Sequence, residues 1–245
     1  MTLNGWHKKY QEILKEFNYD RTKEIRSANI LDSLLKTRFD LTRLEKKIKN
    51  KTVLVIGAGP SLSASLQHIK KIGNLTKIVA DGASQVLIEN KITPDIVVTD
   101  LDGNIEYLKK ASKLKSIMIV HAHGDNIKKL PYTILFKDCL GTTEDKPFGK
   151  IENFGGFTDG DRSVFLANHF GASRIILIGM DFGTHIGKYS KSGTYNKSLK
   201  RKKLRKGKSL LEWLSTKSNS ECYTTSKSIR GFKNMKLADL QKLVR

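Results

Sequence analysis

The sequence has 245 residues, enough for one domain with a sizeable buried core, and it contains no apolar run of the roughly 18 residues that a membrane span needs. Its 45 Lys/Arg against 24 Asp/Glu give a net charge of +21, and the N-terminus lacks the apolar core of a signal peptide. Two cysteines, Cys139 and Cys222, are too few and too far apart for a disulfide framework or a structural zinc site, so we expect a cytoplasmic protein with no membrane partner.

Residues 1–50 are predicted to form a helical N-terminal region. Apolar residues recur at spacings of three and four between Leu3 and Phe17, and again between Leu31 and Leu44. This stripe is typical of a packing surface.

Residues 51–186 are predicted to form an α/β domain. Most of its short β-branched runs are separated by stretches of helical length; they lie at 52–57, 77–80, 95–99, 116–120, 132–136 and 174–179. The runs show no polar alternation, which indicates strands buried on both faces. We therefore predict an open, mostly parallel, Rossmann-like sheet with helices on both faces.

Residues 187–245 carry most of the positive charge, with 17 Lys/Arg and 3 Asp/Glu. We predict a basic loop or lid over 187–208 and a small C-terminal appendage with helices at 209–214 and 235–243. Such a tail suits a polyanion, either nucleic acid, a membrane surface or a nucleotide triphosphate, or is simply a solvated charged run. No zinc-finger spacing, aromatic RNA-binding signature or recognition helix accompanies it, so nucleic acid is not favoured.

Glycine-rich turns follow the first two predicted strands, at the edge of the sheet where ligands bind in such folds. The first reads "GAGPSL" and contains Gly57, Gly59 and Ser61; the second contains Asp81 and Gly82. Both are candidate nucleotide-binding segments, because a glycine turn before a helix lets backbone amides approach a phosphate. The alternative is a tight strand–helix turn with Ser61 as a cap.

Paired carboxylates follow the third strand. Asp100 and Asp102 share a face if the strand continues, and like charges at close range require a cation or a proton between them. Magnesium prefers such oxygen ligands together with substrate phosphates. Asp125 and Asp81, from neighbouring strand ends, are candidates for the same site; the alternative is a capped loop.

Two further polar groups lie at strand or helix ends. His121 and His123 share a face of the fourth strand, and the surrounding carboxylates favour hydrogen bonding or a structural role over zinc. Arg162, in "FTDGDRS", has the guanidinium geometry to bind a phosphate at two points, unless this segment is an ordinary helix cap.

Six motifs in this order resemble the archaeal 6-hydroxymethyl-7,8-dihydropterin pyrophosphokinase family. They are "GAGPSL", "ADGA", "PDIVVTDLDG", "HAHGDN", "GGFTDGDR" and "IGMDFG", over roughly residues 50–190. The family is more distantly similar to thiamine pyrophosphokinases, whose "GDFDS" turn appears here with Thr99 and Gly103 flanking the aspartates.

The resemblance implies transfer of diphosphate from ATP to the hydroxymethyl group of 6-hydroxymethyl-7,8-dihydropterin, with release of AMP, in tetrahydromethanopterin or folate biosynthesis. It implies Mg²⁺ held by Asp100 and Asp102, with Asp125 as a further ligand. Asp125 or His123 is the candidate base for the substrate hydroxyl. Candidate groups for reading the pterin are Asn153, Phe154, Phe157, Asp159 and Asp161. The oligomeric state stays open, and a homo-oligomer is compatible with the sequence.

Two other functions are kept as alternatives. The "GPSL" turn also resembles one in glycosyltransferase-like proteins associated with flagellin modification, which favours an enzyme that handles nucleotide sugars. The basic tail alone favours a non-enzymatic protein that binds RNA or another anion.

Overall fold

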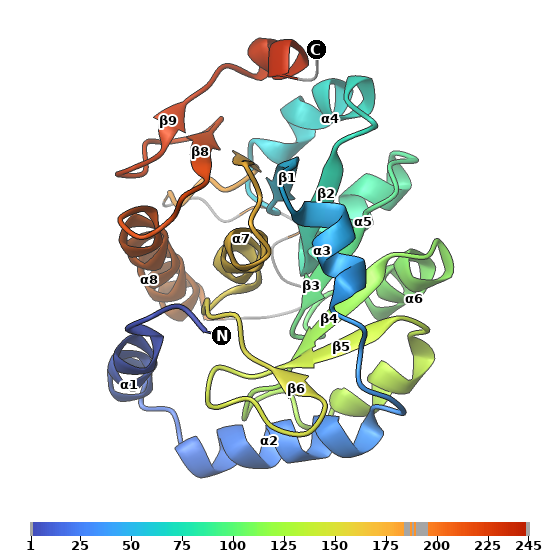
Figure 1. Cartoon of the computed structure of the whole chain (residues 1–245), viewed down its shortest axis with the longest axis vertical. Helices are drawn as coiled ribbons and strands as arrows, with labels where there is room; N and C mark the ends of the chain where they lie inside the picture. The colour runs from blue at the N-terminus through green and yellow to red at the C-terminus, as the bar shows by residue number, and fades with distance from the viewer. Residues whose placement is uncertain (1, 184–186, 188, 190–195, 244–245) are drawn as a thin grey trace.

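The computed structural model describes residues 2–183, 187, 189 and 196–243. Its centre is one sheet of nine strands in the order β6-β5-β4-β3-β2-β1-β7-β8-β9, and every neighbouring pair is parallel (Figure 1). The predicted open α/β sheet is therefore confirmed. The strands are β1 (Thr52–Ile56), β2 (Thr76–Ala80), β3 (Ile96–Thr99), β4 (Ile117–His121), β5 (Cys139–Thr142), β6 (Ile151–Glu152), β7 (Arg174–Ile178), β8 (Glu221–Thr224) and β9 (Lys233–Asn234).

Helices cover both faces of this sheet, because successive strand residues point to opposite sides. Val53 and Val55 of β1 enter one apolar cluster, whereas Leu54 and Ile56 enter another. The first face packs against α1 (Trp6–Phe17), α3 (Thr42–Ile48), α7 (Asp159–His169) and α8 (Lys197–Ser215). The second packs against α2 (Arg21–Leu34), α4 (Leu62–Lys71), α5 (Asp81–Glu89), α6 (Ile105–Lys113) and the 3₁₀ helices η1 (Leu130–Leu135) and η2 (Leu237–Leu243).

The direction of strand addition reverses between β1 and β7. Strands β2 to β6 are added on one side of β1, and β7 to β9 on the other. Connections then leave the carboxyl ends of β1 and β7 in opposite directions, which opens a crevice at that edge. The fold thus places this crevice beside the "GAGPSL" turn.

The strand predicted at 132–136 is wrong. This segment lies in η1, and the strand of that region is β5. Pro131 has no N–H to donate to a sheet ladder and its φ suits a helical turn. Tyr132, Ile134 and Leu135 are exposed, whereas Thr133 and Phe136 are buried, so only part of the run enters the core.

The loop predicted over 187–208 is also wrong from Lys197 onward, where α8 begins. The Asn196 side chain accepts a hydrogen bond from the Leu199 N–H at 3.0 Å and caps the helix, and the following lysines and arginines are good helix formers. Residues 188 and 190–195 of the expected loop lie outside the described residues. Strands β8 and β9 extend the main sheet at its edge.

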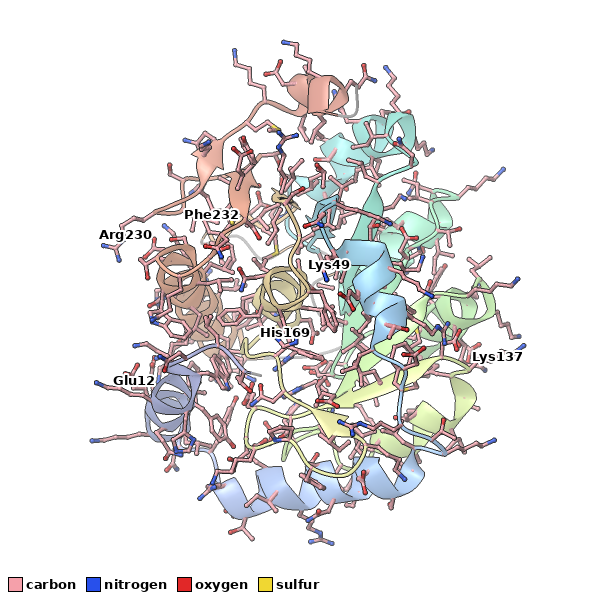
Figure 2. All side chains as sticks on the ribbon, viewed as in Figure 1. Glu12, Lys49, Lys137, His169, Arg230 and Phe232 are labelled. Atoms are coloured by element: carbon pink, nitrogen blue, oxygen red, sulfur yellow. The ribbon has the colours of Figure 1, made fainter. Side chains whose placement is uncertain are left out.

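Helix α8 packs alongside α1 and uses part of its positive charge there. Lys206 lies 2.8 Å from the Glu16 carboxylate and 4.0 Å from that of Glu12, which Figure 2 shows on the outer side of α1. Lys202 donates to the Glu16 carbonyl at 2.6 Å. Among the described helices, none combines the length and apolar character needed to cross a membrane.

Gly207 permits close contact between α8 and the start of α7. A Cβ at this buried position would lie 2.8 Å from Oδ1 of Asp161. The Asp161 carboxylate is already held in place, because its Oδ1 accepts hydrogen bonds from the Thr158 N–H and hydroxyl and its Oδ2 accepts one from the Phe157 N–H. We expect Gly207→Ala to lower the free energy of unfolding by about 1–3 kcal/mol, although alanine favours helices. Chemical denaturation measures this, with Ser198→Ala, exposed on the same helix, as the control. A Gly207→Ala protein as stable as the wild type would contradict this packing.

Candidate active site

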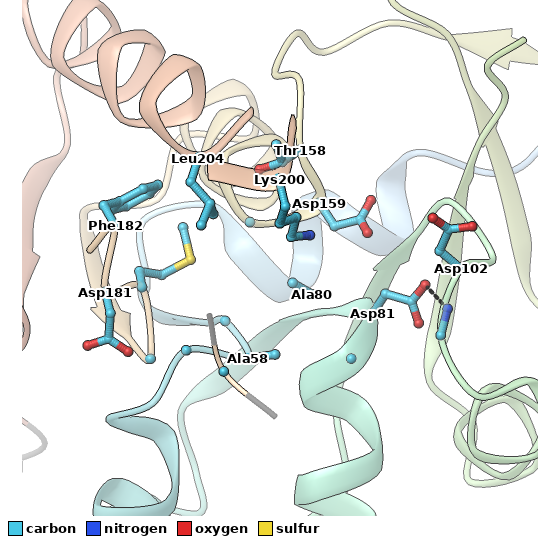
Figure 3. Close-up of a pocket in the computed structure, with 18 of the residues that line it drawn as sticks. Ala58, Ala80, Asp81, Asp102, Thr158, Asp159, Asp181, Phe182, Lys200 and Leu204 are labelled. Carbon is cyan, nitrogen blue, oxygen red and sulfur yellow. Dashed lines mark hydrogen bonds between the residues drawn. The ribbon is translucent and has the colours of Figure 1, made fainter. Parts of the chain in front are cut away.

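A pocket lies at the carboxyl ends of β7, β1, β2 and β3, between the start of α7 and the first turns of α8 (Figure 3). It encloses about 820 Å³ of empty space including its open mouth. Its lining residues are Gly57, Ala58, Gly59, Pro60, Ala80, Asp81, Gly82, Asp100, Asp102, Gly103, Thr158, Asp159, Gly160, Gly179, Met180, Asp181, Phe182, Gly187, Lys200 and Leu204.

Three carboxylates converge in this pocket from three different elements. Asp81 begins α5 directly after β2, Asp100 follows β3, and Asp159 begins α7; one oxygen from each lies within 4.8 Å of the others. Oδ2 of Asp81 accepts hydrogen bonds from Thr99 Oγ1 at 2.8 Å and from the Gly103 N–H at 2.9 Å. Within the described residues its Oδ1 is buried without a hydrogen-bond partner, and such an atom calls for a ligand.

The electrostatics of the cluster also call for a cation. Burial, and then the charge of Asp100, raises the pKa of Asp81 to about 7, and the same two causes raise the pKa of Asp159 well above its usual range. Burial opposes ionisation of Asp100 too, but a hydrogen bond and the charge of His123 outweigh it and lower the pKa of Asp100. Three carboxylates at this separation ionise together only if positive charge joins them, so the site fits a hard divalent cation.

The metal ligands predicted from the sequence are only partly brought together. Asp100 belongs to the cluster, whereas Asp102 lines the same pocket with its Oδ1 2.5 Å from Lys129 Nζ. Asp125 is exposed, and its N–H donates to Nδ1 of His123 at 3.3 Å. Metal binding by Asp102 and Asp125 stays a prediction, and the structure adds Asp159, which the sequence suggested only as a pterin-reading group.

The two histidines have different environments. Nε2 of His123 lies 3.6 Å from Oδ2 of Asp100; burial opposes protonation, but Asp100 outweighs it and raises the pKa of His123. His121 is fully buried, with Nε2 3.6 Å from Oε1 of Glu144, and burial lowers its pKa well below the usual range. The rings of His121 and His123 are stacked, with their centroids 6.3 Å apart. His123 is thus linked to the carboxylate cluster, and His121 to the core behind it.

Arg162 holds Asp159 from behind the pocket. Its side chain is 6% exposed; Nη1 donates to Oδ1 of Asp159 at 3.1 Å, and Nη2 donates to Oε1 of Glu144 and to the Phe157 carbonyl, both at 2.9 Å. The residue is absent from the lining of the main pocket. Phosphate binding by Arg162 stays a prediction, while its contacts in the structure orient a member of the cluster.

The predicted nucleotide-binding glycines line the pocket, but each also accommodates a close approach of the chain itself. A Cβ on Gly57 would lie 2.7 Å from the Gly179 carbonyl, one on Gly59 would lie 2.1 Å from Oδ2 of Asp181, and one on Gly82 would lie 1.8 Å from the Tyr189 carbonyl. These contacts alone explain why larger residues are disfavoured there. They leave the phosphate role of the turn as a prediction.

The alternative interpretation of this turn, with the Ser61 side chain as the cap of α4, is wrong, because that side chain makes no capping hydrogen bond. Its N–H donates to Oδ2 of Asp181 at 3.0 Å, and its hydroxyl lies 3.2 Å from that of Ser226. A carboxylate of the protein therefore already occupies the start of α4.

Some residues considered for reading the pterin have structural partners instead. Asn153 donates to the Glu144 and Asp145 carbonyls, and Asp161 accepts from Phe157 and Thr158. Phe154 packs against His169 and Phe170, and Phe157 against Phe17. Lys200 and Leu204 of α8 line the pocket but were not singled out from the sequence, because one lysine in a long basic run carries no distinguishing pattern.

A parallel sheet with a carboxylate cluster and a lysine beside the carboxyl ends of its strands defines a Rossmann-like α/β protein. Residues 28–187, more than half of the chain, match the family described as MptE-like, 6-hydroxymethylpterin diphosphokinase. The chain belongs to this family of diphosphokinases, which confirms the resemblance of the six motifs.

Curated relatives match over nearly their whole length. The chain is 43% identical over 220 residues to the 6-hydroxymethyl-7,8-dihydropterin pyrophosphokinase of Pyrococcus furiosus, covering 87% of this chain and 94% of that protein. It is 40% identical over 221 residues to the protein of the same name from Methanothermobacter thermautotrophicus, covering 87% and 95%.

A solved structure shares the fold. The Maf glycosyltransferase from Magnetospirillum magneticum AMB-1 superposes with a TM-score of 0.54 at 16% identity, over 87% of this chain. The chain spans 39% of that larger protein. At this identity the likeness concerns the fold alone.

Glu144 provides a pH test of the buried network behind the pocket. Burial outweighs the attraction of Arg162 and raises the pKa of Glu144 to about 7, so the folded protein keeps a proton that the unfolded chain loses near pH 4.5. Its contribution to stability is therefore complete below about pH 4.5 and is lost as the pH rises to 7, by up to about 1.4 kcal/mol per pH unit. His121 has the opposite effect on stability, because it stays neutral in the folded protein but gains a proton in the unfolded chain below about pH 6.5. Its contribution therefore lowers stability as the pH falls below that value.

The comparison with Glu144→Gln isolates this contribution. Urea denaturation between pH 4 and 8 should show that the wild type loses stability relative to Glu144→Gln as the pH rises. Glu106→Gln, on the exposed start of α6, should keep the wild-type profile. Parallel profiles for wild type and Glu144→Gln would show that folding does not raise the pKa of Glu144, and would contradict this prediction.

Proposed function

We propose that the protein transfers diphosphate from ATP to the hydroxymethyl group of 6-hydroxymethyl-7,8-dihydropterin in an Mg²⁺-dependent reaction that releases AMP. The observation that carries the proposal is the Asp81–Asp100–Asp159 cluster, in a pocket that also contains Lys200, within a chain of the diphosphokinase family. The product would enter tetrahydromethanopterin or folate biosynthesis in the cytoplasm.

Asp81, Asp100 and Asp159 are the residues that would hold Mg²⁺. The unpartnered Oδ1 of Asp81 and the raised pKa values of Asp81 and Asp159 support this set of oxygen ligands. When bound, the ion supplies positive charge that neutralises the phosphates and links them to the carboxylates.

The remaining groups position the reactants. Lys200, on the first turn of α8, adds a positive charge on the α8 side of the pocket. Arg162 fixes the carboxylate of Asp159 through its 3.1 Å hydrogen bond, and Glu144 fixes Arg162. Catalysis would thus rest on placement and charge in a partly enclosed site, without a covalent enzyme intermediate.

The transfer breaks the bond between the β-phosphorus and the oxygen that bridges the α- and β-phosphates, and it joins the pterin hydroxymethyl oxygen to the β-phosphorus. AMP leaves with the bridging oxygen, and the hydroxyl proton is released to a base. His123 and Asp125 are the candidate bases; Nε2 of His123 already faces Asp100, and Asp125 is exposed.

Wild-type protein incubated with ATP, Mg²⁺ and the pterin should form AMP and pterin diphosphate in equal amounts, measured by chromatography. Formation of ADP, or no dependence on the pterin, would contradict the proposal.

Exchange of single carboxylates distinguishes the ligand set proposed from the clustered carboxylates from the set predicted from the sequence. Asp159→Asn should lower kcat by about 100-fold or more, because loss of a ligand costs at least as much as loss of a group behind one. Asp125→Asn should change kcat much less. Circular dichroism and thermal unfolding check that both variants fold. A larger loss in Asp125→Asn than in Asp159→Asn would reject the cluster as the metal site.

A further inference from the structure

Asp181 forms one wall of the pocket, directly after β7. Its Oδ2 accepts the Ser61 N–H at 3.0 Å, and the absence of a side chain on Gly59 makes room for this oxygen. Its Oδ1 makes no hydrogen bond within the described part of the chain. The carboxylate is therefore fixed by one oxygen and has acceptor capacity left on the other.

The position of Asp181 makes the start of α4 less favourable for a phosphate. The partial positive charge of a helix N-terminus attracts one anion, and here the carboxylate of Asp181 already fills that role. A phosphate in the same place would lie against a like charge. The phosphates of a bound nucleotide are expected at the other end of the pocket, near Lys200 and the carboxylate cluster.

The lining around Asp181 suits the uncharged part of a nucleotide. Figure 3 shows Phe182 and Leu204 near Asp181 at one end of the pocket, whereas Asp81, Asp102 and Asp159 lie at the other end and Lys200 lies between them. Aromatic and aliphatic side chains favour the flat face of a base. A single fixed carboxylate beside them favours a hydroxyl donor.

We propose that Asp181 accepts hydrogen bonds from the ribose hydroxyls of the nucleotide, and so sets the direction in which ATP lies across the site. The proposal rests on the proposed function for the identity of the nucleotide. Strands β7 and β2 are separated only by β1, so they lie about 10 Å apart. A ribose at Asp181 would direct the phosphates over the end of β1 towards Asp81.

The test compares binding of Mg²⁺-ATP with binding of Mg²⁺-2′,3′-dideoxy-ATP by isothermal titration calorimetry, without pterin. The wild type should bind ATP about 10-fold or more tightly than the dideoxy nucleotide, as expected for hydrogen bonds to a charged acceptor. Asp181→Ala should bind both with the same, weaker affinity. Asp181→Asn keeps an oxygen for the Ser61 N–H and serves as the variant that preserves the start of α4; it should lose most of the difference.

Asp40→Asn is the matched control, because Asp40 accepts the Thr42 N–H at 3.0 Å at the start of α3, outside the pocket lining. It should bind both nucleotides like the wild type. Equal affinities in the wild type would overturn the proposal, as would a preference for ATP that survives in Asp181→Ala. An Asp181→Ala protein that binds ATP normally but loses pterin binding would overturn it in favour of a pterin-reading role. Failure of AMP formation by a wild type that still prefers ATP would reject the proposed function alone.

Discussion

Mutual repulsion of Asp81, Asp100 and Asp159 is the constraint on which the site depends. One oxygen of each lies within 4.8 Å of the others, and burial raises the pKa of two of them. Folding brings like charges into a poorly solvated place, which is costly unless a proton or a cation is shared. A divalent cation bound together with nucleotide phosphates would offset this cost.

The surrounding structure holds the carboxylates in place. Thr99 and the Gly103 N–H orient Asp81, His123 lies beside Asp100, and Arg162 orients Asp159. The second layer reaches into the N-terminal helices, since Trp6 donates to the Glu144 carbonyl at 2.9 Å while Glu144 holds Arg162. The helical N-terminal region thus contacts the residues that orient the site. The apolar stripe in its sequence predicted a packing surface but not this contact.

The sheet was predictable because buried parallel strands leave a strong local pattern, namely short β-branched runs separated by helical stretches. The prediction failed where local pattern and packing disagree: the apolar run at 132–136 lies largely in the 3₁₀ helix η1, with Tyr132, Ile134 and Leu135 exposed, and β5 contains the less typical Gly141. The basic run after Lys197 was interpreted as a loop by its charge, although its residues are good helix formers.

The site was predictable in its location and only partly in its members. The sequence already placed Asp81 and Asp100 at the same edge of the sheet, because the carboxyl ends of parallel strands meet there. Asp159 was given another role, since its approach depends on how the start of α7 crosses above β2 and β3, and no local spacing encodes that. Asp102 is two residues from Asp100 and Asp125 follows the neighbouring strand β4, yet their side chains contact Lys129 and solvent respectively.

The most direct test is a crystal structure with Mn²⁺ and a non-hydrolysable ATP analogue, with the metal located by anomalous scattering. The account predicts a peak within coordination distance of oxygens from Asp81, Asp100 and Asp159, bridged to the nucleotide phosphates. A peak on Asp102 and Asp125, with the three clustered carboxylates left unligated, would contradict it.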